Sequence, residues 1–240
     1  MRDLQRRTIH RRGLLVVFLL ALSGCANRPS IPTYPQTDLE TSLAIARRNM
    51  PSELTLEGEC TLTDERGRSV RLDVVLALRD AERLRLRAWK FGQAVFDLTL
   101  TPEGVWAYSG RPEFDRQRVL GTVGVIRPWL KLFTPVPTGA RVVNDGRERI
   151  ELQSQIESAQ VKTVIDRRTL TLRSHALVAG GATRATIEFD EYAAFGEVVW
   201  PKRIRVREGK RRIELIAGKL TPSTTAKAFD PPRRAERVAE

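Results

Sequence analysis

Apolar and polar residues alternate with a period of two along most of the chain. In the clearest run, residues 54–63, the apolar or small side chains share one face: Leu54, Leu56, Gly58, Cys60 and Leu62. Such a period is typical of a β-strand with one buried face. Ten further runs alternate in the same way, over residues 70–78, 84–88, 94–100, 105–108, 150–156, 161–165, 170–177, 185–189, 204–206 and 213–217. The pattern therefore predicts about ten or eleven strands.

Two segments have helical spacing instead. Residues 38–50 carry apolar side chains on one side, with Asp38 at the N-cap position and Pro51 directly after the segment. Residues 117–133 carry a second apolar stripe, which Pro128 interrupts. We expect a short helix in the first segment and a kinked or broken one in the second.

Short turns rich in Gly, Pro and Asp connect successive alternating runs, so neighbouring strands are expected to pair antiparallel. An open sheet of so many strands tends to curl, split or flatten. We therefore expect an α+β fold, with a curled, mostly antiparallel sheet, or half-open β-barrel, that is closed by a few helices. Because one face of each strand is apolar, this sheet would enclose an apolar cavity.

The first 24 residues have the composition of an export signal. Five arginines precede an apolar run from Leu14 to Leu22. This run is too short to cross a bilayer, which takes about 20 apolar residues. The sequence Leu-Ser-Gly-Cys that ends at Cys25 resembles the lipobox of bacterial lipoproteins, in which the cysteine thiol receives a diacylglycerol and the signal is then cut before it. We expect residues 1–24 to be a lipoprotein signal peptide and Cys25 to be the lipidated residue.

The rest of the chain divides by composition. Residues 25–37 contain three prolines and are expected to form the lipidated anchor and a stiff linker. A single domain is expected over residues 38–222, since 240 residues with 41% hydrophobic content suit one core. Residues 223–240 are charged and rich in proline, and we expect them to be a loosely held tail.

The formal net charge of +12 points to an anionic partner. Removal of the signal, with its five arginines and one aspartate, lowers the charge to +8. An exported protein does not meet nucleic acid, so we expect no nucleic-acid partner. Two rows of alternate arginines would be either a solvated face or a surface that attracts anionic lipid or an acidic protein: Arg83, Arg85 and Arg87, and Arg203, Arg205 and Arg207.

Side chains suited to catalysis or metal binding are scarce. The chain has two histidines, His10 and His175, and two cysteines, Cys25 and Cys60. None stands at the spacing of a zinc site, and the carboxylates form no recognisable acid/base pair. We expect no catalytic residue, no metal and no cofactor, and therefore no enzyme. Cys60 lies on the apolar face of its strand and is expected to be a small buried side chain.

Three stretches of the chain carry short sequence patterns whose order along the chain is informative. Residues 85–98 read as two strands joined by a short loop, in which Phe91 precedes a glycine. Residues 129–135 have the pattern Trp-Leu-x-x-x-x-Pro at the end of the central helical segment, and residues 200–204 begin a late strand with Trp-Pro. With a lipobox in front, this order resembles the LolA/LolB lipoprotein-carrier superfamily, and LolB-like outer-membrane lipoproteins in particular.

The resemblance implies a protein anchored in the outer membrane and facing the periplasm. Its partners would be the acyl chains of lipoproteins or phospholipids, a LolA-like periplasmic carrier that hands them over, and the inner leaflet of the outer membrane; it would act as a monomer. Phe91, with Trp89 close by, matches the family's protruding apolar side chain, which helps to insert the cargo into the membrane. The candidates for lining the lipid cavity are Trp106, Trp129, Leu130 and Phe133.

Two other functions fit the same pattern. An RseB-like protein uses this fold as a sensor or envelope interaction module, binding misplaced lipids or lipoproteins and restraining a signalling partner. A surface-structural lipoprotein with a filled core is the third possibility. Sequence alone does not separate the three, because a cavity and a core are built from the same residues.

Overall fold

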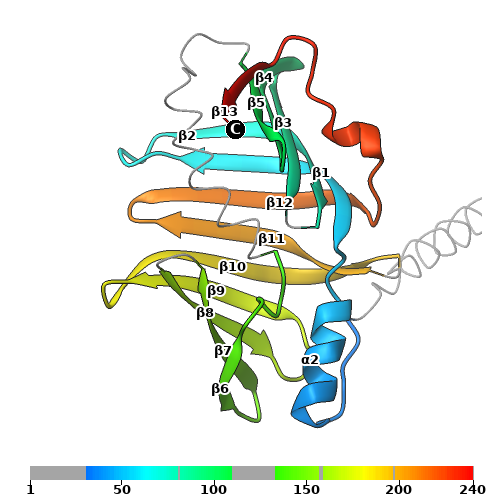
Figure 1. Cartoon of the computed structure of the whole chain (residues 1–240), viewed down its shortest axis with the longest axis vertical. Coiled ribbons are helices and arrows are strands. Elements are labelled where there is room, and N and C mark those ends of the chain that lie inside the picture. Colours follow the sequence, from blue (N-terminus) through cyan, green and yellow to red (C-terminus); the bar gives the residue numbers. More distant parts are fainter. Residues whose placement is uncertain (1–30, 81, 110–132, 157–158, 197, 240) are drawn as a thin grey trace, which may run out of the picture. The chain divides into compact units, whose positions relative to one another are not determined.

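The computed structural model describes residues 31–80, 82–109, 133–156, 159–196 and 198–239, all within one compact unit. In this part of the chain a sheet of 13 strands is accompanied by one α-helix and one 3-10 helix (Figure 1). The elements are α2 (Leu39–Arg48), β1 (Glu53–Thr63), β2 (Ser69–Arg79), β3 (Arg83–Lys90), β4 (Gln93–Thr101), β5 (Gly104–Ser109), β6 (Arg141–Asp145), β7 (Arg149–Ile156), β8 (Ala159–Asp166), β9 (Leu172–Ala179), β10 (Ala182–Phe195), β11 (Val198–Glu208), β12 (Arg211–Thr221), η1 (Ala226–Phe229) and β13 (Glu236–Ala239).

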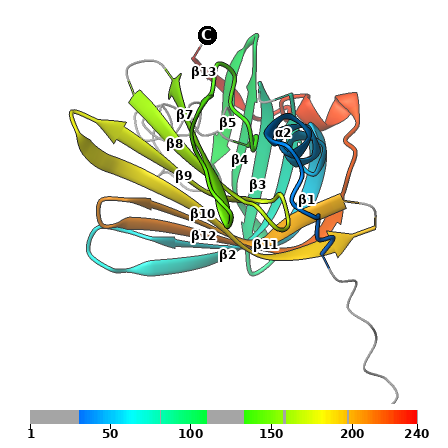
Figure 2. The ribbon, with the colours of Figure 1, turned by 90° about the horizontal axis from the view of Figure 1, so that it is seen from below.

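Every neighbouring pair of strands is antiparallel, in the order β13-β5-β4-β3-β2-β1-β12-β11-β10-β9-β8-β7-β6. Two runs of consecutive hairpins, β1–β5 and β6–β12, are joined side by side through β1 and β12. In Figure 2 the sheet is a curved layer, with β2 and β10–β12 at its base and β3–β5 and β7–β8 rising above them on either side. The sheet is curled and not closed.

One face of the curled sheet carries the hydrophobic core. Directly opposed residues of an antiparallel pair share a face, and the register places Leu56, Leu76 and Leu86 on the same line across three strands. The largest core cluster draws its buried residues from β1–β5 and from β8–β13, among them the fully buried Trp200. We call this side the apolar face and the other side the outer face.

Helix α2 covers one end of the apolar face. Its N-cap is Asp38, whose carboxylate accepts a hydrogen bond of 2.9 Å from the Thr41 N–H. Arginines occupy its last turn, where they suit the negative end of the helix dipole. Ala46 is buried in a second cluster with Ile150 and Leu152 of β7 and Ile165 of β8. The predicted helix over residues 38–50 is therefore confirmed, with slightly shorter bounds.

The C-terminal segment differs from the loosely held tail that its composition predicts. Residues 226–229 form η1, and β13 pairs with the edge strand β5. Phe229 and Val238 are each 5% exposed. We call residues 222–239 the strap, because they cross the outer face of the sheet and end as its edge strand. Composition misled here because two buried apolar side chains fix a segment that is otherwise polar.

The other fold predictions are partly confirmed. A large, curled, antiparallel sheet is present, and all eleven predicted runs are strands. The number of strands was wrong, because β6 and β13 were missed. The predicted second helix, residues 117–133, lies almost wholly outside the described residues. A closure by several helices is likewise not seen in the described part, which holds one α-helix.

Candidate functional site

The turn between β3 and β4 presents an aromatic side chain to solvent. Phe91 and Gly92 form the two-residue loop, and both have positive φ, 53° and 74°. Such a pair is typical of a type I′ hairpin turn, whose backbone twist matches that of the two flanking strands. The positive φ at the first turn position is unfavourable for a bulky residue such as Phe91. The Phe91 side chain is 92% exposed, the most exposed of the large hydrophobic residues in the described part. The local backbone thus holds the ring away from the sheet.

Cations lie beside the aromatic residues of this hairpin. The Lys90 Nζ is 5.6 Å from the centre of the Phe91 ring, and the Arg87 Cζ is 5.5 Å from the centre of the Trp89 ring. Trp89 is half-buried at the end of β3, where its partner in the register of β2 is Asp73. The hairpin therefore combines one exposed aromatic ring, a second one that is half-buried, and a positive charge beside each.

Phe133 is the cavity-lining candidate that the structure places at the core. Its half-buried side chain packs against the largest cluster, next to Pro135, which is buried. Trp129 and Leu130 lie outside the described residues, as does Cys25. Their roles in lining a cavity and in lipidation therefore stay predictions.

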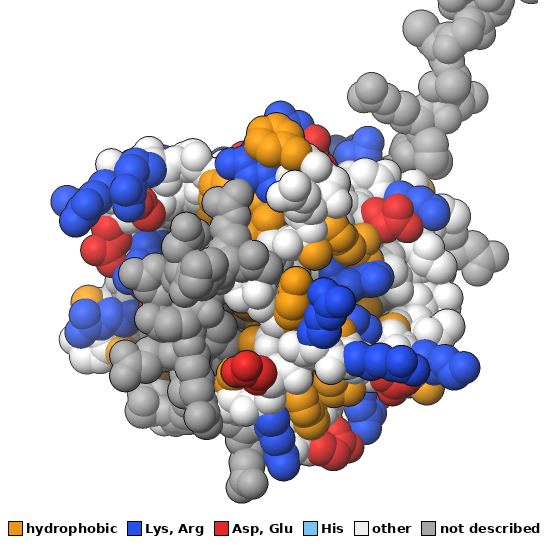
Figure 3. Space-filling view, turned by 90° about the horizontal axis from the view of Figure 1, so that it is seen from above, with side chains coloured by type: hydrophobic (Ala, Val, Ile, Leu, Met, Phe, Trp, Pro, Cys, Tyr) orange, Lys and Arg blue, Asp and Glu red, His pale blue; other side chains and the backbone are white. Residues whose placement is uncertain are grey.

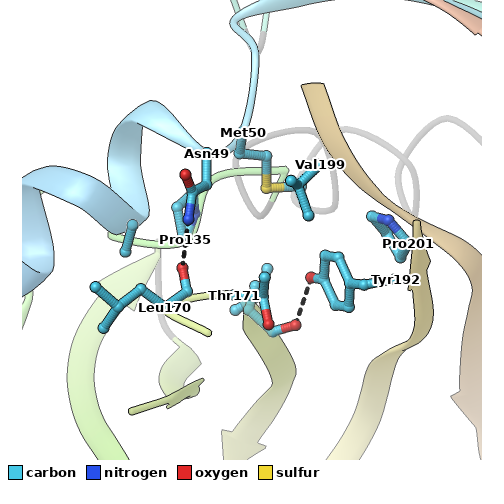
Figure 4. A pocket seen from close by; sticks show the side chains of 10 residues that line it. Asn49, Met50, Pro135, Leu170, Thr171, Tyr192, Val199 and Pro201 are labelled. Carbon is cyan, nitrogen blue, oxygen red and sulfur yellow. Dashed lines mark hydrogen bonds between the residues drawn. The ribbon is translucent and has the colours of Figure 1, made fainter. Parts of the chain in front are cut away.

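A small cavity lies where the end of α2 meets the apolar face (Figure 4). Its volume is about 10 Å³, about the space of one water and far too small for an acyl chain. The Asn49 amide donates to the Leu170 carbonyl over 3.2 Å, and the Tyr192 hydroxyl donates to the Leu172 carbonyl. Burial raises the pKa of Tyr192, with a smaller contribution from Asp190, so this hydroxyl stays protonated. These bonds hold α2 and β10 on the β8–β9 turn.

Trp106 does not lie on the apolar face, contrary to its selection as a cavity-lining residue. Its register partner is Thr99, whereas Val105 and Ala107 oppose Leu100 and Leu98 on the apolar face. On the outer face, the Arg237 Cζ of β13 is 5.7 Å from the centre of the Trp106 ring. Because both sets of alternate residues in β5 are apolar or aromatic, the sequence pattern there did not reveal which set faces inward.

Arg85 of β3 and Arg79 of β2 hold the strap on the outer face. Arg85 forms a bidentate ion pair with Asp97 (3.0 and 2.8 Å), and its Nη1 also donates to the carbonyls of Ala228 and Asp230. Arg79 of β2 donates to the Thr224 carbonyl over 2.7 Å and lies 5.6 Å from the centre of the Phe229 ring. Sequence reasoning missed these contacts, because the strap was not expected to pack.

The arginines of β11 form a more open network with acidic residues. Arg205 pairs with Asp190 and, at 3.5 Å, with Glu188. Arg203 pairs with Glu191 and Glu214 at 3.1 and 3.4 Å. In the view from above, Lys and Arg side chains form several separate groups on this face, some beside Asp or Glu (Figure 3). Much of the positive charge on β11 is therefore balanced within the chain.

The two remaining reactive side chains of the described part are buried. Burial raises the pKa of the Cys60 thiol to about 11, which disfavours the reactive thiolate. His175 is fully buried, with its Nδ1 2.8 Å from the Thr163 hydroxyl and its ring edge-on to Phe189.

The described residues contain no group of three or more His, Cys, Asp or Glu side chains that could hold a metal ion. None of the helices in this part has the length and apolar character needed to traverse a bilayer.

Comparison with known proteins establishes the fold. No family model and no curated protein matches the sequence. A LolA-superfamily protein from Nitrosomonas europaea aligns with a TM-score of 0.57 at 9% identity, over 80% of this chain and 97% of that one. A domain designated an outer-membrane lipoprotein-sorting protein, from Vibrio parahaemolyticus, aligns with a TM-score of 0.53 at 13% identity, over 80% and 97% of the two chains. A DUF1329 family protein from Desulfovibrio piger aligns with a TM-score of 0.50 at 9% identity, over 81% and 98%. The chain is thus similar to LolA-superfamily structures in its fold.

Proposed function

We propose that the protein is a lipid-anchored periplasmic lipoprotein that binds acyl chains and helps to insert lipoproteins or lipids into the outer membrane. The similarity of its fold to LolA-superfamily and lipoprotein-sorting structures supports this class of function. The lipobox that ends at Cys25 supports the anchor. Two or three acyl chains, at about 0.8 kcal/mol per buried methylene, would hold it almost permanently in a membrane.

The exposure of Phe91 is the observation that carries the proposal. A Phe side chain gains roughly 1.5–3 kcal/mol when it passes from water into an apolar environment. At 92% exposure the folded chain gains almost none of this. The same turn puts Lys90 beside the ring, where its amine can reach the headgroup region while the ring enters the acyl chains. A bilayer is the partner that suits both side chains.

The acyl chains would bind on the apolar face of the curled sheet, where the packing would have to open, because the cavity of about 10 Å³ at its α2 end holds no more than one water. An acyl chain of about 16 carbons could gain roughly 12 kcal/mol on leaving water for such a surface, before the cost of ordering. Such a site needs few polar groups, and Phe133 is the candidate from the described residues that packs there. No metal, cofactor or catalytic group is needed for the transfer.

Transfer of a lipoprotein from a loaded LolA-like carrier to liposomes tests the proposal. We expect the wild type and Phe91→Leu to transfer the cargo and Phe91→Glu to lose most of the transfer, while still accepting the cargo from the carrier. The matched control is Val143→Glu, which puts the same charge at another exposed apolar position, on β6. Equal transfer by Phe91→Glu and the wild type would remove the insertion role. A wild type that transfers nothing would overturn the proposed function.

A further inference from the structure

Side chains on the outer face of the central strands form lines that cross the sheet. On one line, Glu188, Arg205, Glu214, Thr61 and Arg71 oppose one another in turn from β10 to β2. The charges on this line alternate in sign, as they do between Asp190 and Arg203 on the next line. Opposite charges at facing positions stabilise a sheet. On these two lines the chain supplies the counterions of its own arginines.

The line nearest the β11–β12 turn lacks this balance. Arg207 and Arg212 face each other directly, an arrangement of like charges that destabilises a strand pair. Arg207 has one distant ion-pair contact, 3.8 Å to Glu188, and none of the ion pairs among the described residues includes Arg212. Hydroxyl groups of Thr186 and Thr63 continue the line on either side. Two guanidinium groups flanked by hydroxyls are the chemistry of a phosphate site.

The surface at this line is hollowed. A groove of about 280 Å³ is lined by residues of three adjacent strands: Thr61, Thr63, Arg205, Arg207, Arg212 and Glu214, with Val206 and Ile213. Arg207 and Arg212 are both exposed, so a ligand can reach them from solvent. Lys210 adds another cation in the adjoining turn. The groove is therefore open, polar and unbalanced in charge.

We infer that this groove binds the phosphate of an anionic phospholipid headgroup at a bilayer surface. The inference rests on the proposed function and deepens it by naming the lipid class and the site. Arg207 and Arg212 would share the phosphate, and Lys210 in the turn would lie near neighbouring headgroups. A membrane supplies many phosphates at once, which suits a site that continues into a basic turn.

The position of the groove in the sheet fits a membrane partner. In an antiparallel sheet the hairpin turns β1–β2, β3–β4 and β11–β12 all lie at the same strand ends. The groove adjoins the β11–β12 turn, and Phe91 forms the tip of the β3–β4 turn. The same rim of the sheet thus carries the exposed aromatic ring and the uncompensated arginines. A bilayer that receives Phe91 would also present phosphates to this rim.

Binding to vesicles tests the inference. The chain is used from Ile31, since residues 31–240 form one compact unit that contains the whole sheet and its core clusters. We expect it to bind vesicles of phosphatidylcholine with phosphatidylglycerol more tightly than vesicles of phosphatidylcholine alone. Each of Arg207→Gln and Arg212→Gln should weaken binding to the anionic vesicles by about fivefold, the effect of one basic residue at such a surface. Binding to the neutral vesicles should not change.

The matched control is Arg149→Gln, which removes the same charge from an exposed arginine of β7, at the opposite strand ends. It should leave binding to both kinds of vesicle unchanged. If Arg149→Gln weakens binding as much as Arg212→Gln does, net charge is responsible and the site is overturned. Circular dichroism and a thermal melt of each variant confirm that folding is unchanged, as expected for exposed side chains.

Inorganic phosphate separates a lipid site from a site for free phosphate. We expect it to bind the chain only weakly and to compete poorly with anionic vesicles. Tight binding of inorganic phosphate that Arg212→Gln abolishes, with no preference between the vesicles, would overturn the lipid as ligand. If Phe91→Glu abolishes vesicle binding while Arg207→Gln and Arg212→Gln do not affect it, the inference fails and the proposed function stands. If the wild type binds neither kind of vesicle, the membrane role in the proposed function fails as well.

Discussion

The two arginine rows, Arg83–Arg85–Arg87 on β3 and Arg203–Arg205–Arg207 on β11, have the same sequence pattern and opposite environments. The middle residue of the β3 row, Arg85, has a side chain that is 15% exposed, and its partner Asp97 is 13% exposed. Arg205, in the middle of the β11 row, is 35% exposed and its partner Asp190 is 41% exposed. The strap crosses the first row, whereas the second stays open to solvent. Alternation gives the face of a side chain, but the segment that later covers that face decides its role.

The largest predicted effect is the loss of Arg85. In Arg85→Ala, the carboxylate of Asp97 stays buried without its partner, and the strap loses the donor to Ala228 and Asp230. Removal of one member of a buried ion pair costs roughly 3–5 kcal/mol. We expect a loss of this size in the free energy of unfolding, measured in urea. Arg85→Leu combined with Asp97→Leu should recover part of it, since no buried charge then remains. A loss below 1 kcal/mol would mean that the two rows are equivalent.

The apolar contact of the strap should have the next largest effect. Phe229 is 5% exposed, under Arg79, and Phe229→Ala removes most of what it buries. We expect a loss of roughly 3 kcal/mol in the free energy of unfolding, at the low end for a buried Phe because the site lies on the outer face. Amide hydrogen exchange in β13 should be faster in the variant than in the wild type, while exchange in β1 stays the same. If β13 exchanges equally in both proteins, its pairing with β5 does not depend on Phe229.

The smallest effect is expected for the open row. Arg205→Ala removes ion pairs between partly exposed groups, which are typically worth about 0.2–1 kcal/mol. This loss should shrink further as the salt concentration rises, whereas the loss in Arg85→Ala should depend little on salt. Urea unfolding at low and high salt provides the comparison. Equal and salt-independent losses in the two variants would break the distinction between the rows.

The strands that the sequence revealed are those with one buried face. In β1 the residues Leu54, Leu56 and Cys60 are buried, and their alternation shows directly in the sequence. The strand β6 was missed because all of its residues are exposed and a bulge follows Val142. The strand β13 was missed because its pairing with β5 joins segments far apart in the chain, and a local pattern holds no information on such a pairing.

The part of the candidate site that lies in a turn could be predicted from the sequence, whereas the parts that depend on the face or the register of a strand could not. Phe91 was expected in a loop because Gly92 follows it, and the structure places it there with positive φ. Trp106 was assigned to the wrong face because β5 has large or apolar residues in both alternating sets. The pairing of Arg207 with Arg212 required the register of β11 and β12, which no pattern within either strand supplies.

The pairing of β1 with β12 has a consequence for how the chain reaches its native state. These neighbours at the centre of the sheet come from near the start and near the end of the described chain. Contacts between such distant residues slow folding, because a long loop must close before the pair is formed. The sheet cannot join its two runs of hairpins until β12 has been synthesised. If the chain is exported as proposed, this delay keeps the centre of the sheet unpaired until nearly all of the chain has crossed the membrane.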